Sequence, residues 1–145
     1  MNILFIMFDQ LRFDYLSCAG HPHLKTPHID RLAQRGVRFT NAYVQSPICG
    51  AARMSCYTGR YVSSHGAQWN NSPLRVGEWT MGDHLRQAGM GCWLIGKTHM
   101  NADSEGMARL GLSPDSVIGA RQAECGFDVW IRDDGLWAEG PDGFY

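Results

Sequence analysis

The chain has little net charge, no long apolar run and no paired set of cysteines. Its formal net charge is −1 and 19% of its residues are charged, so it offers no broad basic surface of the kind that binds nucleic acid. The apolar run that opens the chain covers only residues 3–8. It is too short to span a membrane, and it has neither a basic leader nor a cleavage site. We therefore expect neither nucleic acid nor a membrane among the partners.

The five cysteines are odd in number and lack disulfide-like or zinc-like spacing. This usage fits a reducing compartment, and the expected location is the cytoplasm. Four of them, Cys18, Cys56, Cys92 and Cys125, are interpreted as structural or surface thiols. No internal repeat or low-complexity segment is visible. A length of 145 residues allows one domain with a reasonable core.

Helix and strand signals alternate along the chain and predict an α/β fold, with a mostly parallel sheet flanked by helices. Continuous apolar runs and strand-forming residues predict buried or partly buried strands. Helical spacing with capping residues predicts helices that end at glycines. Residues 106–121 have the weakest pattern and are interpreted as an insertion near the entrance of the site. The expected strands cover 3–8, 37–44, 90–95 and 127–131, and the expected helices cover 26–36, 50–57 and 80–88.

Cys49 precedes the predicted helix Gly50–Tyr57, which Gly59 is expected to end. A helix N-terminus favours anions because of its unpaired N–H groups and its dipole. Arg53 follows one turn later and can reach the same place. Cys49 and Arg53 are therefore candidate catalytic residues. Two alternatives are a buried structural cysteine beside a surface arginine, and an ordinary thiolate nucleophile of low pKa.

Asp9 and Gln10 end the first predicted strand. Open α/β sheets place ligands at the carboxyl ends of their strands, and oxygen donors of both kinds suit a hard cation. Asp9 and Gln10 are therefore candidate metal ligands, and the alternative is a carboxylate that merely ends a strand. His21 and His23 invite a metal interpretation as well. No acidic or cysteine partner lies at a matching distance, so a surface loop is favoured.

Lys97 and His99 follow the predicted strand 90–95. Alternate residues of an extended segment point the same way, so both side chains can converge on one site. Lysine supplies a point charge, and histidine can donate a hydrogen bond or a proton. The alternative for this pair is a solvated turn. The cations Arg53, Lys97 and Arg60 are local and suit a small anion.

Four segments in a fixed order resemble the sulfatase family. Cys49–Arg53 followed by Thr58–Arg60 resembles the family signature, although Ala51 replaces the commoner proline. Asp9-Gln10 resembles the phosphonate monoester hydrolase and choline-sulfatase branches. Thr26–Gly36 resembles a structural helix, in which His28 and Asp30 are expected to be solvated. Gly96–Met100 resembles the lysine–histidine segment, with Thr98 in place of an aromatic residue of the pocket wall. These four segments are distributed over about one hundred residues, from Asn2 to about Met100.

The resemblance implies an alkaline-phosphatase-like fold, with residues 1–145 as the N-terminal, truncated part of a sulfatase-type catalytic domain. It implies that a maturation enzyme oxidises Cys49 to formylglycine, whose hydrate attacks sulfate, phosphate or phosphonate esters. It also implies a divalent metal, Ca²⁺ or Mn²⁺, held by Asp9, Gln10 and the modified Cys49. Arg53, Lys97 and His99 would stabilise the transferred group, and His99 would protonate the departing alcohol.

The remaining ligands expected of this family find no match after Met100, so the chain is expected to be incomplete alone. Asp133-Asp134 is interpreted as a solvated acidic turn, and residues 137–145 as a chain ending in a loop. Two alternatives stay open: a non-catalytic fragment or pseudo-hydrolase that keeps an anion site, and a thiol enzyme using Cys49 and His99. The expected partners are a small anionic ester and the formylglycine-generating enzyme. The oligomeric state is left open.

Overall fold

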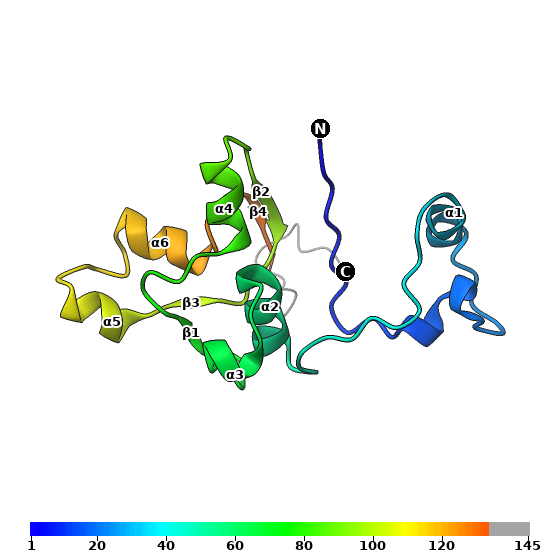
Figure 1. Ribbon diagram of the computed structural model, residues 1–145, viewed down its shortest axis with the longest axis horizontal. Coiled ribbons are helices and arrows are strands. Elements are labelled where there is room, and N and C mark those ends of the chain that lie inside the picture. Colours follow the sequence, from blue (N-terminus) through cyan, green and yellow to red (C-terminus); the bar gives the residue numbers. More distant parts are fainter. Residues whose placement is uncertain (134–145) are drawn as a thin grey trace, which may run out of the picture. The chain divides into compact units, whose positions relative to one another are not determined.

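The structure is a computed structural model that describes residues 1–133, including all side chains in that range except those of Ala120, Gln122 and Ala123. Asp134 and the predicted terminal loop 137–145 lie outside the described residues. The chain forms two compact units, Met1–Tyr43 and a second unit that begins at Val44 (Figure 1). Helices and parallel strand pairs make up the described part, which confirms the α/β class.

The first unit contains two single 3-10 turns, η1 (Phe13–Tyr15) and η2 (Ser17–Ala19), and the helix α1 (Pro27–Arg35). The predicted helix is confirmed, with Pro27 at its start and Gly36 at its end. The strand predicted at 3–8 is absent, since these residues have no regular structure and are exposed from 36% at Met7 to 84% at Leu4. A central strand needs neighbours for its N–H and C=O groups, and residues 1–43 contain no strand.

Asp30 joins α1 to the turn η2, which corrects the expectation that this carboxylate is solvated. Its Oδ2 accepts from the Ser17 hydroxyl at 2.6 Å, and its Oδ1 accepts from the Cys18 N–H at 2.9 Å and from the Thr26 hydroxyl at 3.0 Å. Thr26 holds the N-cap position, but its side chain makes these contacts instead of capping the helix backbone. Hydrogen bonds led by that from Ser17 keep the pKa of Asp30 below its ordinary value.

The second unit carries the remaining described elements. Its helices are α2 (Cys49–Thr58), α3 (Val62–His65), α4 (Met81–Gln87), α5 (Ser104–Arg109) and α6 (Val117–Ala123). Its strands are β1 (Pro73–Leu74), β2 (Trp93–Gly96), β3 (Asn101–Ala102) and β4 (Asp128–Arg132). They form two parallel pairs, β1 with β3 and β2 with β4.

Local signals fix the start of α4 and the end of α2, the two helices that the sequence predicted in this unit. Thr80 and Asp83 form a capping box at the start of α4, and the Gly59 N–H bonds the Ser55 carbonyl at the end of α2 with φ of +68°. Gly82 packs α4 against the turn before β4, because a Cβ there would collide with the carbonyl of Cys125. The Thr80 hydroxyl donates to that same carbonyl at 2.5 Å.

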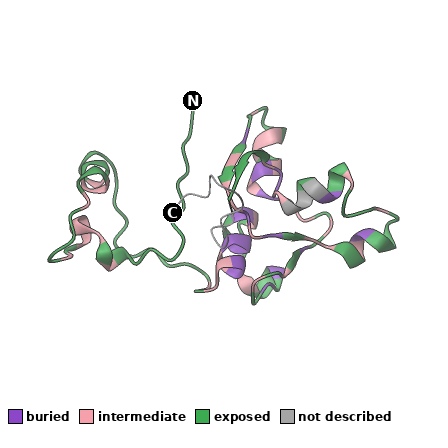
Figure 2. Ribbon diagram, turned by 180° about the vertical axis from the view of Figure 1, so that it is seen from behind, coloured by how far each residue is buried: buried purple, intermediate pink, exposed green. Residues whose placement is uncertain are grey.

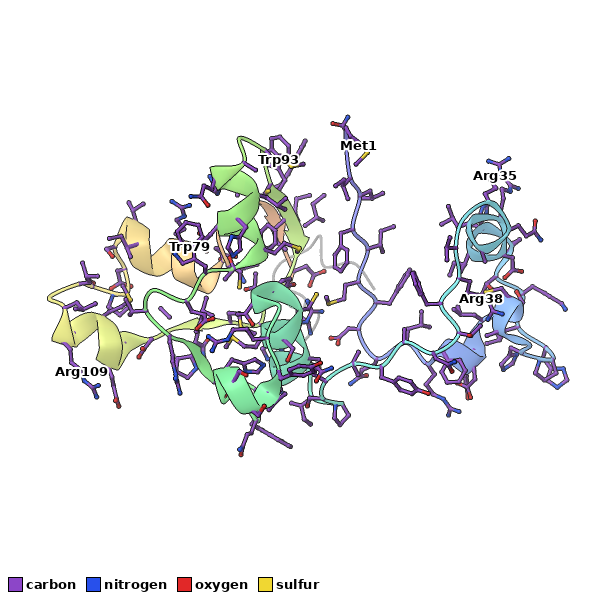
Figure 3. All side chains as sticks on the ribbon, in the orientation of Figure 1. Met1, Arg35, Arg38, Trp79, Trp93 and Arg109 are labelled. Carbon is purple, nitrogen blue, oxygen red and sulfur yellow. The ribbon has the colours of Figure 1, made fainter. Side chains whose placement is uncertain are left out.

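The core of the second unit lies between α2, the start of α4 and the turns around the strands. Its buried apolar residues are Met54, Tyr57, Ala67, Leu74, Met100 and Cys125. Figure 2 shows buried residues along α2 and none along residues 1–43. The faces of β2 and β4 stay open, and Trp93 lies at the surface with 65% of its area exposed (Figure 3).

Several sequence predictions for this unit need correction. The strand predicted at 90–95 forms as β2, but it is half-exposed instead of buried, because Trp93 and Ile95 on one of its faces are 65% and 70% exposed. Strand 127–131 is confirmed as β4. The strand predicted at 37–44, a segment that ends one residue beyond the first unit, is absent, and these residues are exposed. Residues 106–121, the segment with the weakest sequence pattern, include parts of α5 and α6.

Candidate functional site

The first residue of α2 is Cys49, which is half-buried. The Gly50 N–H, next along the helix, donates to Asn70 Oδ1 at 2.8 Å. A Cβ on Gly50 would lie 3.0 Å from Asn70 Cα and 3.2 Å from the Trp69 carbonyl oxygen. Glycine therefore lets the turn at 69–71 approach the helix end closely. The structure confirms Cys49 at a helix N-terminus and shows that Asn70 borders it, a neighbour that the sequence did not indicate.

Arg53 connects α2 with the segment after β2. Its side chain is buried, with 6% exposed, and its Nη1 donates to the Lys97 carbonyl at 2.9 Å and to the Tyr57 hydroxyl at 3.2 Å. A buried guanidinium needs such acceptors because its charge has left water. The alternative of a surface arginine is therefore wrong. Arg53 and the Lys97 backbone come together, as one shared site requires.

Lys97, Thr98 and His99 follow β2 directly and differ in burial. Thr98 is fully buried with 0% exposed, whereas Lys97 and His99 are half-buried. Thr98 is therefore a buried polar residue, and the effect on the pocket wall that the sequence suggested for it stays a prediction. His99 has φ of +60°, so the segment is not simply extended there. A strict alternation of side chains, from which the convergence of Lys97 and His99 was predicted, ends at this residue.

Strained backbone marks several of the candidate residues. Four non-glycine residues of the described chain have positive φ: Gln10, Asn71, His99 and Cys125. Left-handed backbone is uncommon outside glycine, and where it occurs it gathers at functional sites. Two of the four, Gln10 at +58° and His99 at +60°, were singled out from the sequence, and Asn71 adjoins Asn70.

Asp9 and Gln10 lie in the first unit, and their donor chemistry fits a hard cation. The carboxylate and the amide oxygen are ligands that calcium and similar ions accept. Within residues 1–133, no group of three or more His, Cys, Asp or Glu side chains converges. The described residues thus offer two candidate oxygen ligands and no complete coordination sphere.

The other candidates from the sequence have local roles. His21 Nδ1 accepts the N–H groups of His23 and Leu24 at 3.2 and 2.8 Å, which favours the surface-loop interpretation. Arg60 Nη1 donates to both carboxylate oxygens of Glu78 at 2.7 Å, so its charge is paired within the second unit.

A buried histidine that the sequence did not indicate holds α2 against α3. The Ala67 N–H donates to His65 Nδ1 at 3.1 Å, so this nitrogen is an acceptor and the proton lies on Nε2, 2.7 Å from the Ser55 hydroxyl. Burial, aided by the charge of Arg60, lowers the pKa of His65, and Glu78 acts in the opposite direction. The neutral imidazole of His65 therefore links α3 to α2, the helix that begins at Cys49.

Comparison with known proteins agrees with the motifs. Residues 1–132 match the sulfatase family. The chain is 35% identical over 129 residues to the ulvan-active sulfatase of Formosa agariphila, covering 89% of this chain and 23% of that protein. It is similar to the crystal structure of a phosphonate monoester hydrolase of Agrobacterium radiobacter, with a TM-score of 0.72, 32% identity and coverage of 86% of this chain and 24% of that one.

A second solved structure, the phosphonate monoester hydrolase of Silicibacter pomeroyi, gives a TM-score of 0.75 at 29% identity, over 91% of this chain and 26% of that one. The chain therefore spans about a quarter of the length of these relatives. No helix among the described residues has the length and apolar character needed to cross a membrane. The predicted family resemblance and the alkaline-phosphatase-like fold are both confirmed.

Proposed function

The chain belongs to the sulfatase family, and on that premise we propose that the whole protein hydrolyses sulfate esters or phosphonate and phosphate esters. Its nucleophile is a formylglycine made from Cys49 by a maturation enzyme, and its substrate is a small anionic ester. Gln10 beside Asp9 favours phosphonate esters or a broad-specificity arylsulfatase activity, whereas Lys97 and His99 favour sulfate esters.

The surroundings of Cys49 support this proposal most directly. The residue opens α2, where backbone N–H groups favour an anion. Arg53 of the same helix contacts the Lys97 backbone, so the segment that carries Lys97 and His99 lies beside α2. Positive charge from Arg53 and Lys97 stabilises the oxygens of the transferred group as charge develops on them. His99 is the proposed acid for the departing alcohol.

Two groups complete the proposed chemistry. Formylglycine, as its hydrate, supplies a hydroxyl nucleophile together with an internal route for releasing the anion, which serine and cysteine lack. A divalent cation, Ca²⁺ or Mn²⁺, supplies positive charge at the nucleophile and the transferred group when bound. Asp9, Gln10 and the modified Cys49 are the residues of this chain proposed to hold it.

The test compares two cysteines of the same helix in the whole protein, produced together with a formylglycine-generating enzyme. Cys49→Ser is expected to lower the turnover of an aryl sulfate or aryl phosphonate by at least about a thousandfold, since the nucleophile is lost. Cys56→Ser, which changes an exposed thiol of α2, is the matched control and retains turnover. Both variants should keep the wild-type circular dichroism spectrum. Turnover that survives Cys49→Ser ends the proposal.

Two other results would replace the proposal with an alternative. Inactivation of the wild type by iodoacetamide, blocked by prior binding of inorganic phosphate, would identify a thiol enzyme that uses Cys49 with His99 as base. Binding of inorganic sulfate without hydrolysis of any ester would identify a pseudo-hydrolase that keeps the anion site. A formylglycine enzyme has no thiol at this position and survives iodoacetamide.

A further inference from the structure

We propose that Tyr57 is a positioning residue for the proposed hydrolysis. Its hydroxyl fixes the direction of the Arg53 guanidinium and joins the nucleophile helix to the backbone of Lys97. The inference rests on the proposed function, because the role assigned to Arg53 is to stabilise the transferred group.

The three groups form a hydrogen-bonded triangle. Tyr57 follows Arg53 by one helical turn, so both side chains leave the same face of α2. Arg53 Nη1 lies 3.2 Å from Tyr57 Oη and 2.9 Å from the Lys97 carbonyl oxygen, and Tyr57 Oη lies 3.4 Å from that oxygen. A carbonyl only accepts, so the phenol donates to Lys97 and accepts from Arg53. The last distance is long for a hydroxyl donor, so the contacts of Arg53 dominate.

The hydroxyl of Tyr57 has no other use in the described structure. The residue is buried with 5% exposed, and its ring packs edge-on against Phe127 with centroids 5.7 Å apart. Phenylalanine has the same ring and would fill the same space without a polar atom to satisfy. Burial also raises the pKa of Tyr57, so the phenol stays neutral and keeps its donor. The polar contact with Arg53 is what distinguishes tyrosine from phenylalanine here.

Arginine has a long flexible side chain, and its usefulness at a site depends on the direction of its fork. Arg53 Nη1 donates to two acceptors, the Tyr57 hydroxyl of the same helix and the Lys97 carbonyl oxygen, and together they restrict the rotation of the guanidinium. Removing the hydroxyl leaves one acceptor and permits the fork to turn. The expected consequence is a misdirected charge with an intact fold, because α2 keeps its packing.

Tyr57→Phe in the whole protein is expected to lower kcat/KM for the ester about tenfold, the scale of one hydrogen bond to a charged group. Tyr61→Phe, at an exposed tyrosine of the following turn, is the matched control with wild-type kcat/KM. Phe127→Leu removes ring packing and keeps the phenol, so it is expected to lower Tm and leave kcat/KM within about twofold. A tenfold loss of kcat/KM in Phe127→Leu would mean that the effect of Tyr57→Phe comes from packing alone.

A double-mutant cycle gives the decisive comparison. If Tyr57 acts through Arg53, Tyr57→Phe has less than about a twofold effect on kcat/KM when Arg53→Gln is already present. The same tenfold loss in both backgrounds would overturn the proposal, and so would full activity of Tyr57→Phe alone.

A readout independent of turnover separates this inference from the proposed function. Amide hydrogen exchange over residues 96–100 is expected to rise about tenfold in Tyr57→Phe and to stay unchanged when Tyr57→Phe is added to Arg53→Gln. If the wild type hydrolyses no ester but this exchange pattern appears, the proposed function fails while the link stands. Unchanged exchange in Tyr57→Phe removes the link whatever the enzyme does.

Discussion

The two units hold their helices by different means. In Met1–Tyr43, none of whose residues is buried, α1 is tied to η2 by the carboxylate of Asp30 and the hydroxyls of Ser17 and Thr26. In the second unit, α2 contributes the buried side chain of Met54 to an apolar cluster that also contains Leu74. The first arrangement gives local order through a few polar contacts. The second gives a rigid base from which Cys49 and Arg53 can be presented.

The largest expected difference between the units comes from matched truncations on their helices. Met54→Ala removes a side chain of α2 that is 2% exposed, and the lost burial plus the cavity are expected to lower the free energy of unfolding by about 3 kcal/mol. Leu32→Ala on α1, at 68% exposed, is expected to change it by less than about 0.5 kcal/mol. Urea unfolding followed by circular dichroism measures both. Equal losses would erase the contrast between the units.

The pH dependence of unfolding tests the role of His65 in the second unit. Its folded pKa lies below the ordinary value of 6.5 because burial disfavours the imidazolium. The unfolded chain therefore binds more protons below that pH. The contribution of the neutral His65 imidazole to the free energy of unfolding is therefore fully present above pH 6.5. It is lost as the pH falls toward the folded pKa. His65→Gln is expected to flatten the dependence of the unfolding midpoint between pH 7.5 and 5.5. A slope identical to that of the wild type would remove His65 from the link between α2 and α3.

The first unit is tested through Asp30. The folded pKa of Asp30 is lowered, chiefly by the hydrogen bond from the Ser17 hydroxyl. The contribution of the carboxylate to the free energy of unfolding is therefore present above the ordinary pKa of 3.8, and it is lost as the pH falls through the lower folded pKa. Asp30→Asn is expected to accelerate amide exchange at Cys18 at neutral pH, while amides of α2 keep the wild-type rates. Asp14→Asn, which breaks an exposed pair with Arg12, serves as the control. Slow exchange at Cys18 in Asp30→Asn would mean that the Asp30 carboxylate does not hold the turn η2 against α1.

The smallest effect is expected at the Arg60–Glu78 ion pair, which stands at the surface of the second unit. Arg60→Ala is expected to change the free energy of unfolding by less than about 1 kcal/mol, because exposed pairs are screened by water and salt. Since Arg60 is engaged by Glu78, the same change should leave the binding of inorganic phosphate unaffected, as isothermal titration would show. A tenfold loss of phosphate affinity in Arg60→Ala would show instead that Arg60 contributes to anion binding.

Features set by neighbours in sequence were predictable, and features set by distant partners were not. The capping box of Thr80, the glycine that ends α2 and the position of Cys49 at a helix start follow from local residue order. The contact of Arg53 with Lys97 joins residues 44 apart, and that of Gly50 with Asn70 joins residues 20 apart. No local pattern signals such pairs.

The apolar run Ile3–Phe8 shows the limit for strands. Its composition predicts burial, but a strand exists only with hydrogen-bonded neighbours, and residues 1–43 provide none. Asp9, Gln10 and His99 were chosen for their chemistry and order, and two of the three have the left-handed backbone expected of constrained positions.

The most direct measurement is the mass of the tryptic peptide Phe39–Arg53, recovered after iodoacetamide treatment from cells that contain a formylglycine-generating enzyme. This peptide carries Cys49 and no other cysteine. We predict that the thiol has been replaced by an aldehyde and that the peptide is not alkylated. A fully alkylated Cys49 under these conditions would contradict the proposed nucleophile.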